Sequence, residues 1–235
     1  MVKYDCTVRN AANDVIQFVY GDSGIDSARQ FEHSLKLLIM SDADIIKKYK
    51  FTTDELKQYN ISQKENDNYI NDMLSMRDQL RTSQRKVLLD YKTLSGNYML
   101  PVNFNRIIDN TRAIKMESKE KLDAKYIIDK LNDVLDYKNT MLFALGKDEM
   151  NNKNSIRYKD EMVSKTIFKF AMIEYLAPKR CLAEYNLSKA QFEEIIEQII
   201  KSYNKAVIEP GEMVGVIAAQ STGEPVTRWV IKSIC

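Results

Sequence analysis

Hydrophobic residues along most of the chain recur at the spacing of an α-helix. The clearest stretch begins with Ser188 and Gln191, an S-x-x-Q pair typical of a helix capping box. Apolar residues then follow an i, i+3, i+4, i+7, i+8, i+11 stripe, at Phe192, Ile195, Ile196, Ile199, Ile200 and Tyr203. This pattern predicts an amphipathic helix that buries one face.

Three earlier segments repeat the helical spacing. Asn103 can cap the first of them, in which Phe104, Ile107, Ile108 and Thr111 form one face. The second carries its apolar face at Ala124, Ile127, Ile128, Leu131, Val134 and Leu135. The third, "IFKFAMIEYLAP", is expected to end before Pro178, because the residue before a proline disfavours the helical conformation.

Only the first part of the chain favours a β-sheet. The runs "CTVR" and "DVIQFVYG" are separated by "NAAN", which predicts a short β-hairpin. After "GDSGID" turns the chain, Asp26 can cap a helix whose apolar positions are Ala28, Phe31, Leu35 and Leu38. The predicted fold class is therefore mainly α with a short N-terminal β-hairpin.

Residues 41–72 are polar, most of all in "SQKENDNYIND", and we expect an exposed or poorly ordered insertion near 51–72. A helical pattern resumes through "MLSMRDQLRTSQRKVLLDYKTL" and breaks at "SGNYMLPVN". We find no internal repeat in the sequence.

Composition places the chain among globular proteins with one or two hydrophobic cores. It has 235 residues, of which 44% are hydrophobic and 29% are charged. No apolar run approaches the roughly 18 to 20 residues of a membrane span, and "MVKYDCTVRN" does not resemble a secretory signal, so we expect an intracellular protein. The 35 Lys and Arg residues nearly balance the 33 Asp and Glu residues. This balance predicts contact with DNA or RNA only within a larger assembly.

Residues that could carry chemistry are few and scattered. The three cysteines are far apart and have a single histidine, His33, to accompany them, which excludes a disulfide frame or a zinc site; they are Cys6, Cys181 and Cys235. We interpret them as reduced thiols. His33 has no nucleophile that the sequence places beside it, and we interpret it as a surface residue.

Two charged groups of residues have a structural and a functional interpretation. Asp42 and Asp44 form the only close carboxylate pair, and we interpret them as helix caps rather than magnesium ligands. A basic helical face at Arg77, Arg81 and Arg85 could contact phosphate or an acidic protein. We favour a solvated face beside Asp78 and Asp90. Lys179 and Arg180 can complement a helix C-terminus.

The last segment, "PGEMVGVIAAQSTGEP", is rich in small residues. Pro210 suits a helix start and Glu212 its first turn. Glycine inside a helix costs about 0.5 to 1 kcal/mol relative to alanine, so we expect Gly215 to serve close packing. A second helix is predicted to start at Pro225 behind Glu224, after a tight turn at "STG". The apolar run is too short for a membrane helix pair.

This terminal segment resembles the signature with which the largest subunit of multisubunit DNA-directed RNA polymerases, of the eukaryotic polymerase II-like type, enters its trigger loop. In that family the trigger loop closes over the incoming nucleotide. Three further motifs resemble the same subunit in the same order. The stretch "YDCTVRNAANDVIQFVYGDSGID" resembles the segment after the bridge helix, and "LPVNFNRIIDN" resembles a motif of the foot region. The stretch "APKRCLAEYNLSKAQFEEII" resembles the approach to the trigger loop. The resemblance covers essentially the whole chain and is weakest from about Phe51 to Asp72.

The resemblance stops abruptly after Thr227. The final residues "RWVIKSIC" stand where the family has "QMTLNTFH", so that Arg228, Lys232 and Cys235 replace its glutamine, asparagine and histidine. The "NADFDGD"-type loop that binds catalytic magnesium in the family is absent from the sequence. The resemblance therefore implies no catalytic residue, metal or cofactor in this chain, with magnesium bound elsewhere in the complete polymerase.

What the resemblance implies for the chain is a division into three parts. Residues 1–40 are a hairpin and helix that follow the bridge helix, residues 41–205 a foot-like helical domain, and residues 206–235 the trigger-loop base with a truncated or divergent first trigger helix. The implied base residues are Pro210, Gly211, Glu212, Gly215, Gln220, Gly223, Glu224, Pro225 and Thr227. The implied partners are the rest of the largest subunit and small subunits at the foot, with DNA and RNA only in the assembled complex and no membrane.

Such a protein would act in the nucleus, or in a viral factory or virion if its source is a virus. The chain would be one piece of a split subunit, or one exon's product that ends in sequence from an intron. Two alternatives stay open: an all-helical adaptor or scaffold without a polymerase connection, and a gene fragment without function. The adaptor explains the amphipathic helices and the balanced charge but not four ordered motifs.

Overall fold

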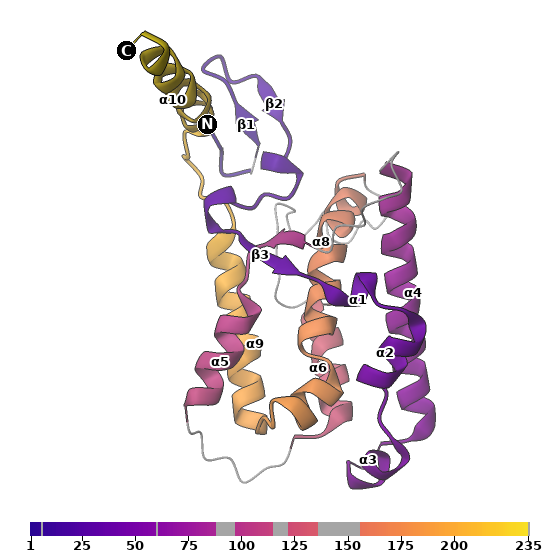
Figure 1. The fold of residues 1–235 in the computed structure, drawn as a ribbon. Coiled ribbons are helices and arrows are strands. Elements are labelled where there is room, and N and C mark those ends of the chain that lie inside the picture. Colours follow the sequence, from indigo (N-terminus) through magenta and orange to yellow (C-terminus); the bar gives the residue numbers. More distant parts are fainter. Residues whose placement is uncertain (6, 60, 88–96, 115–121, 136–155, 235) are drawn as a thin grey trace.

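In the part of the chain that the structure describes, two small antiparallel sheets lie among helices, which form most of the fold (Figure 1). The computed structural model describes residues 1–234 apart from 6, 60, 88–96, 115–121 and 136–155. The predicted mainly α fold class is confirmed.

Short strands and helical turns occupy the first part of the chain, and longer helices follow; η denotes a 3₁₀- or π-helical turn. The first group comprises β1 Val8–Arg9, β2 Val15–Gln17, η1 Tyr20–Asp22, η2 Ser27–Arg29, β3 Phe31–Ser34, α1 Lys36–Ile39, α2 Asp42–Tyr49 and α3 Thr53–Gln58. The second group comprises α4 Gln63–Val87, β4 Asn97–Leu100, α5 Phe104–Ala113, α6 Ala124–Leu135, α8 Ile156–Tyr175, η3 Arg180–Glu184, α9 Lys189–Ala206 and α10 Val214–Ile234.

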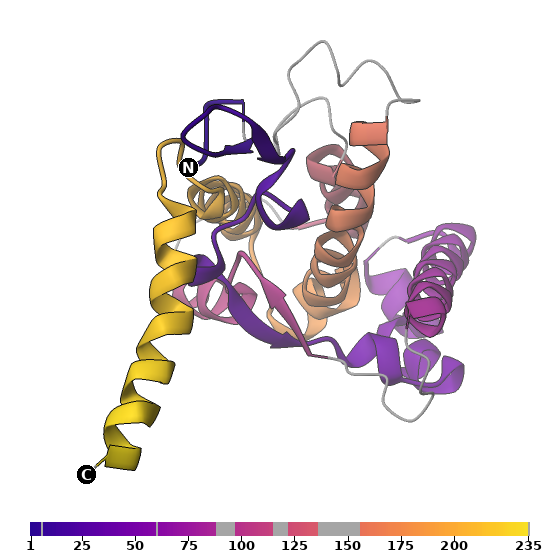
Figure 2. The same cartoon turned by 90° about the horizontal axis from the view of Figure 1, so that it is seen from above.

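Helices α5 and α9 lie side by side and confirm the two clearest sequence patterns (Figures 1 and 2). At the start of α9, Ser188 Oγ accepts the Gln191 N–H at 3.3 Å, and Gln191 Oε1 accepts the Ser188 N–H at 3.1 Å, which is the predicted capping box. Asn103 caps α5 by accepting the Arg106 N–H at 3.1 Å. The predicted apolar face of α5 is buried, as is that of α9 except for the partly buried Ile200.

The main core lies between α8 and its neighbours. Phe104 from α5 is fully buried and its ring stacks on Tyr175 of α8 with centroids 5.1 Å apart. The ring of Phe168, also on α8, lies 5.6 Å from that of Phe104. As predicted, α8 ends before Pro178, and α6 spans the expected residues. Burial of these aromatic rings is a main source of the stability of residues 30–205, which we call the helical body.

The helix predicted after Asp26 is wrong. Asp26 does accept the Ala28 N–H at 3.0 Å, but the helical turn it caps ends at Arg29. Residues Phe31–Ser34 form strand β3, which pairs antiparallel with β4. The sheet forms because β4, from the segment interpreted as a break, offers backbone partners about 65 residues away, and pairing with a distant strand outweighs a weak local helical pattern.

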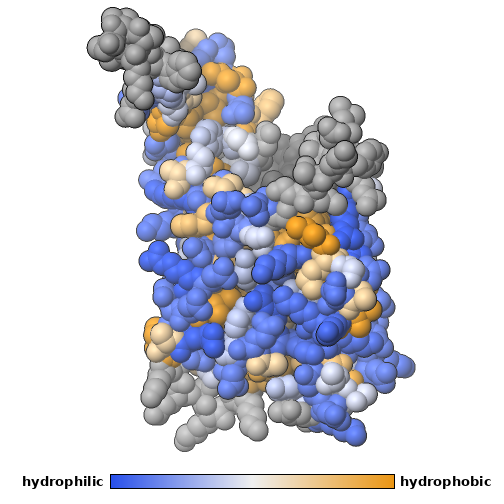
Figure 3. All heavy atoms as spheres, viewed as in Figure 1, coloured by the Kyte–Doolittle hydropathy of each residue, from blue (hydrophilic) through white to orange (hydrophobic). Residues whose placement is uncertain are grey.

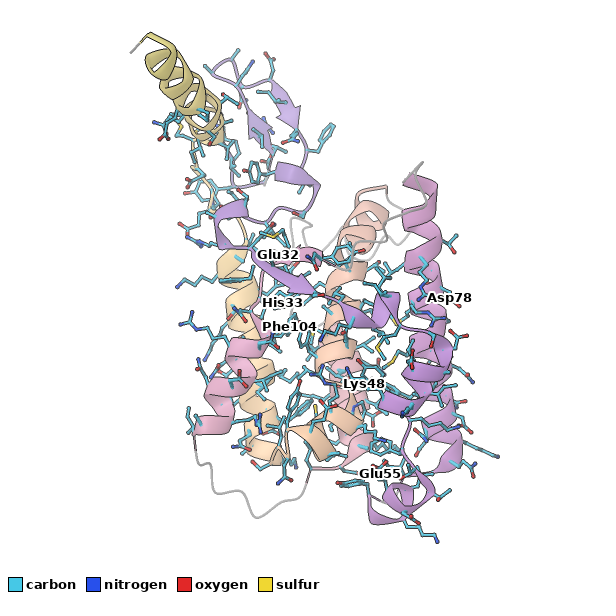
Figure 4. All side chains as sticks on the ribbon, in the orientation of Figure 1. Glu32, His33, Lys48, Glu55, Asp78 and Phe104 are labelled. Carbon is cyan, nitrogen blue, oxygen red and sulfur yellow. The ribbon has the colours of Figure 1, made fainter. Side chains whose placement is uncertain are left out.

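The interpretation of His33 as a surface residue is also wrong. It is the buried member of β3, and its Nδ1 lies 3.2 Å from the Tyr175 hydroxyl oxygen. The Phe104 ring meets it edge-on, and Figure 4 shows the two side chains next to each other. Burial lowers the pKa of His33 below its ordinary value of 6.5.

This lowered pKa predicts a loss of stability in mild acid. The unfolded chain takes up a proton at His33 near pH 6.5 while the folded chain resists it, so the free energy of unfolding falls as the pH drops from 6.5 through the lower folded pKa. We expect this contribution of His33 to lower the urea midpoint between pH 7 and pH 5. His33→Asn should flatten this slope, whatever its stability at pH 7. Equal slopes in the two proteins would contradict the prediction.

The polar stretch near 51–72 is helical rather than poorly ordered. Thr52 and Glu55 form a capping box for α3, and α4 begins at Gln63. Asn66 is buried, and its side-chain amide exchanges hydrogen bonds of 3.4 Å with the backbone of Phe51. The stretch therefore contributes to the packed body, although most of its side chains are polar and exposed.

The arginines of α4 are structural, which corrects the predicted solvated face. Arg77 is 2% exposed and forms ion pairs with Asp42 at 2.6 Å and Asp78 at 2.8 Å. Arg81 donates to the backbone carbonyls of Leu38 and Met40 at 2.8 Å, at the C-terminus of α1. Both side chains therefore bind groups within the fold. The side chain of Arg85 and all of Asp90 lie outside the described residues.

Asp42 and Asp44 are not the caps of α2, which corrects the role predicted for them. Ser41 is the N-cap of this helix, and its hydroxyl donates to Asp44 Oδ2 at 2.7 Å. Arg180 does complement a helix C-terminus, donating to the Glu174 carbonyl at 3.0 Å, whereas Lys179 donates to the Lys50 carbonyl after α2 at 2.8 Å.

Candidate functional site

The segment singled out by its glycines meets the first residues of the chain. We call residues 1–29 and 206–225 the terminal module. Figures 1 and 2 show the hairpin β1–β2 and the start of α10 beside each other at one end of the helical body. The hairpin predicted from "CTVR" and "DVIQFVYG" is confirmed, although its strands are short.

Backbone hydrogen bonds join the two parts of the terminal module. The Asp26 N–H donates to the Ala206 carbonyl and the Ile208 N–H to the Gly24 carbonyl, each at 2.9 Å. Farther along, the Val2 N–H donates to the Glu212 carbonyl at 2.9 Å. The residues that lead into α10 are therefore held as an added strand-like segment against the start of the chain.

Arg29 adds a charged connection at the same place. Its guanidinium donates to the Lys205 carbonyl at the end of α9 and lies 3.1 Å from the Glu209 carboxylate and 3.5 Å from that of Asp26. Sequence reasoning missed this residue. Arg29 and Lys205 are 176 positions apart, so no local pattern could have indicated the contact.

A small separate core supports the module. It consists of Val2, Val8 and Ile208, with Tyr20 and Val214 packed against it. Beside it, hydrogen bonds from Thr7 lower the pKa of the Asp5 carboxyl to about 2, and Arg9 lies 2.8 Å from the same carboxylate. The small size of this core means that the module depends mainly on its backbone hydrogen bonds.

The turn before α10 depends on Gly211. Its φ of 96° lies in the region that side-chain-bearing residues rarely adopt, and its N–H donates to the Val2 carbonyl at 2.8 Å. The helix then begins at Val214 and not at Pro210, so Glu212 lies before the first turn. The predicted helix start is therefore wrong by four residues, because the backbone of this stretch is bonded to the N-terminal segment instead.

The prediction of two helices joined by a tight turn is wrong as well. A single helix, α10, continues from Val214 to Ile234 with Pro225 in its interior. Pro225 cannot donate to the Ser221 carbonyl, which removes one bond of the helix. The hydroxyl group of Ser221 donates to the Ile217 carbonyl at 2.9 Å, and that of Thr222 donates to the Ala218 carbonyl at 3.0 Å.

The surface of the terminal module is unusually apolar. All three residues of β2 are exposed, and Ile16 and Phe18 keep exposed fractions of 66% and 69%. On α10 the apolar Val216 and Ile217 are 51% and 46% exposed. Figure 3 shows hydrophobic atoms gathered at this end of the molecule. Exposed apolar residues that lie together on a surface are typical of a packing site, so the strand β2 and the first turns of α10 are a candidate contact surface.

The structure places the predicted base residues along one stretch of chain. Pro210, Gly211 and Glu212 form the turn, and Gly215, Gln220, Gly223, Glu224 and Pro225 follow on the exposed helix. Thr227 lies on the same helix, with its side chain outside the described residues. Among the residues described, a Cβ atom added at Gly215 would meet nothing within 4 Å. The close packing expected for Gly215 is therefore not made within the described chain.

Reactive or metal-binding groups do not converge in the described ranges. Within them, no three His, Cys, Asp or Glu side chains are close enough to hold a metal ion. Burial raises the pKa of the Cys181 thiol to about 12, which keeps it protonated and unreactive; Cys6 and Cys235 lie outside the described residues. Among the helices that the structure describes, we find no candidate for a membrane span.

Comparison with known proteins connects the whole chain to one family. Residues 22–206 match the family model "RNA polymerase Rpb1, domain 6". The chain is 34% identical over 242 residues to DNA-directed RNA polymerase subunit 1 of Acanthamoeba polyphaga mimivirus. It is 31% identical over 256 residues to the DNA-directed RNA polymerase II subunits RPB1-A and RPB1-B of Trypanosoma brucei brucei. These alignments cover 98% of this chain but only 16% and 14% of the relatives.

Proposed function

Because this chain belongs to the RNA polymerase Rpb1 domain 6 family, we propose that its terminal module supports the trigger loop of a DNA-directed RNA polymerase. The chain is homologous to a segment of the largest subunit. The helical body serves as a foot-like domain, and Pro210–Thr227 form the base on which the trigger loop pivots. The activity belongs to the whole enzyme, since the chain spans 16% of its mimivirus relative.

One observation carries this proposal: α10 begins with apolar and small residues that are exposed in the described chain. Glycine at position 215 weakens a helix, so its presence is best explained by a neighbour that approaches closely in the assembled enzyme. The hydrogen bonds from Val2 and Ile208 hold the residues that lead into α10 in place.

The proposed partners follow from the same division. The terminal module would pack against the remainder of the largest subunit, and the helical body would contact small polymerase subunits. DNA and RNA would be met only in the assembled enzyme, consistent with the balanced charge of the chain. Catalytic magnesium would be bound elsewhere in the polymerase, and no residue of this chain is proposed as a ligand for it.

Gly215→Leu tests the proposal by acting differently on the isolated chain and on the assembled polymerase. In the isolated chain the added side chain has open space and improves helix propensity, so we expect equal stability or a gain of about 0.5 to 1 kcal/mol. In the polymerase that contains this segment, the same side chain should block close packing. We expect nucleotide addition to slow by about tenfold or more, measured in single-turnover extension of a primed template.

Ala113→Leu is the matched control, since Ala113 is also small, exposed and helical but lies on α5. It should leave both stability and elongation unchanged. Elongation at the normal rate by the Gly215→Leu polymerase would overturn the proposed role. Recovery of no polymerase subunit by a tagged chain would contradict the proposed assembly with the rest of the enzyme.

A further inference from the structure

A groove lies between the first turns of α4 and α6. Figure 1 shows the first turns of these helices at the α3 end of the helical body, away from α10. We call it the α4–α6 groove. It encloses about 240 Å³. Its apolar lining consists of Phe51, Ile61, Tyr69, Ile128 and Pro178. This volume is below the roughly 300 to 1,000 Å³ of small-molecule pockets and is better suited to one or two side chains of a partner.

The rim of the α4–α6 groove is acidic. Glu65 and Asp72 come from one face of α4, and Asp123 and Asp129 come from the start of α6. Among the described residues of the lining, Lys125 is the one that is cationic. Four carboxylates against one ammonium group leave an excess of three negative charges around an apolar hollow.

Contacts among the described residues leave most of these charges unpaired. Lys125 Nζ lies 3.8 Å from Glu65 Oε1, and both side chains are largely exposed. Among the described residues, the carboxylates of Asp72, Asp123 and Asp129 form no ion pair. In the same part of the chain no acidic cluster is tight enough to hold a metal ion, so the carboxylates are spaced for separate cations.

From this juxtaposition we propose that the α4–α6 groove binds a basic amphipathic peptide segment of another protein. An aliphatic side chain of that segment occupies the hollow against Phe51 and Ile128, and its Lys or Arg side chains pair with the rim carboxylates. Nucleic acid is disfavoured because its phosphates would be repelled by the same rim. The site is separate from the terminal module and does not depend on the function proposed for it.

The test uses the full 235-residue chain and fluorescein-labelled synthetic helical peptides, with binding followed by fluorescence anisotropy. The probe is an amphipathic peptide of lysine and leucine. Two matched peptides replace its lysines with glutamate or its leucines with serine. We expect the lysine–leucine peptide to bind at least about tenfold more tightly than either of the others, and to weaken as salt is raised.

Variants of the protein locate the site. Asp72→Asn combined with Asp129→Asn should weaken binding of the lysine–leucine peptide by about tenfold, since it removes two of the carboxylates that pair with the lysines. The control combines Asp109→Asn with Asp133→Asn, which removes two exposed carboxylates outside the groove. It should bind the peptide normally.

Three outcomes would overturn the proposal. Equal losses in the two double variants would show attraction to diffuse surface charge. Equal binding of the serine peptide would show that the hollow accepts no apolar anchor. Competition by a single-stranded oligonucleotide for the same carboxylates would indicate a nucleic-acid ligand. Hydrogen exchange gives an independent measurement, in which the bound peptide should protect residues 61–72 and 123–129.

Discussion

Replacing Phe104 with alanine should lower the free energy of unfolding by about 3 to 5 kcal/mol, the range found for fully buried aromatic residues. The Phe104 ring stacks on Tyr175 at 5.1 Å and an interplanar angle of 12°, and it also meets Phe168 and His33. Removing it opens a cavity among rings that belong to α8 and β3 and cannot easily collapse. Urea denaturation followed by far-ultraviolet circular dichroism measures the change.

Phe18→Ala is the matched control, because this phenylalanine is 69% exposed in the terminal module. It should change the stability of the isolated chain by less than about 0.5 kcal/mol. A loss of similar size in both variants would contradict the conclusion that the core lies around Phe104. The comparison also separates the helical body from the terminal module, whose apolar residues are proposed to act in assembly.

The second large effect is expected for Glu174→Ala, at about 2 to 4 kcal/mol. The Glu174 carboxylate is buried at the end of α8 and accepts the N–H groups of Lys36 and Leu37 at 3.0 and 3.3 Å. It therefore caps α1, where Leu37 and Leu38 are fully buried. Alanine leaves both N–H donors without their acceptor, and each hydrogen bond to a charged group contributes about 1.5 to 3 kcal/mol. Part of this loss is offset because the alanine variant no longer buries a charged carboxylate.

Glu174→Gln should lose less, because an amide oxygen still accepts one of the two N–H groups. Burial raises the pKa of Glu174 above its ordinary value of 4.5, against the lowering effect of these bonds. The Glu174 carboxyl therefore stays protonated to higher pH in the folded chain than in the unfolded chain. The stability that this difference in proton binding contributes is lost as the pH rises from 4.5 through the folded pKa. Glu174→Gln should remove that part of the pH dependence.

Glu197→Ala provides the control for this pair of variants. Glu197 is exposed on α9 and pairs with Lys201 at 2.6 Å, so its removal should cost less than about 0.5 kcal/mol. A Glu174→Ala chain as stable as the Glu197→Ala chain would show that α1 does not depend on its acceptor from α8.

The sequence was most informative where contacts are local. Helices α5 and α9 could be predicted because their caps, Asn103 and Ser188, lie within three residues of the N–H groups that they bind. Their buried faces could be predicted because the helical period brings apolar residues to one side. The candidate site was found in a different way, through a family motif near Gly211 and Gly215.

Prediction failed where one feature depends on a distant partner. Strand β3 and the burial of His33 depend on β4, about 65 residues away. Asp42, one of the two aspartates at α2, forms an ion pair with Arg77. The helical spacing of the arginines on α4 could not indicate this contact between two helices.

The helical character of the chain, its strongest caps and buried faces, and its membership of the polymerase family could all be predicted from the order of the residues. The way residues 24–29 and 205–212 come together, the start of α10 and the burial of particular polar side chains became known only from the fold. This difference follows from the range of the interactions. Helical periodicity and capping act over a few residues and leave a pattern in the sequence, whereas strand pairing, ion pairs between helices and burial join positions that share no local signal.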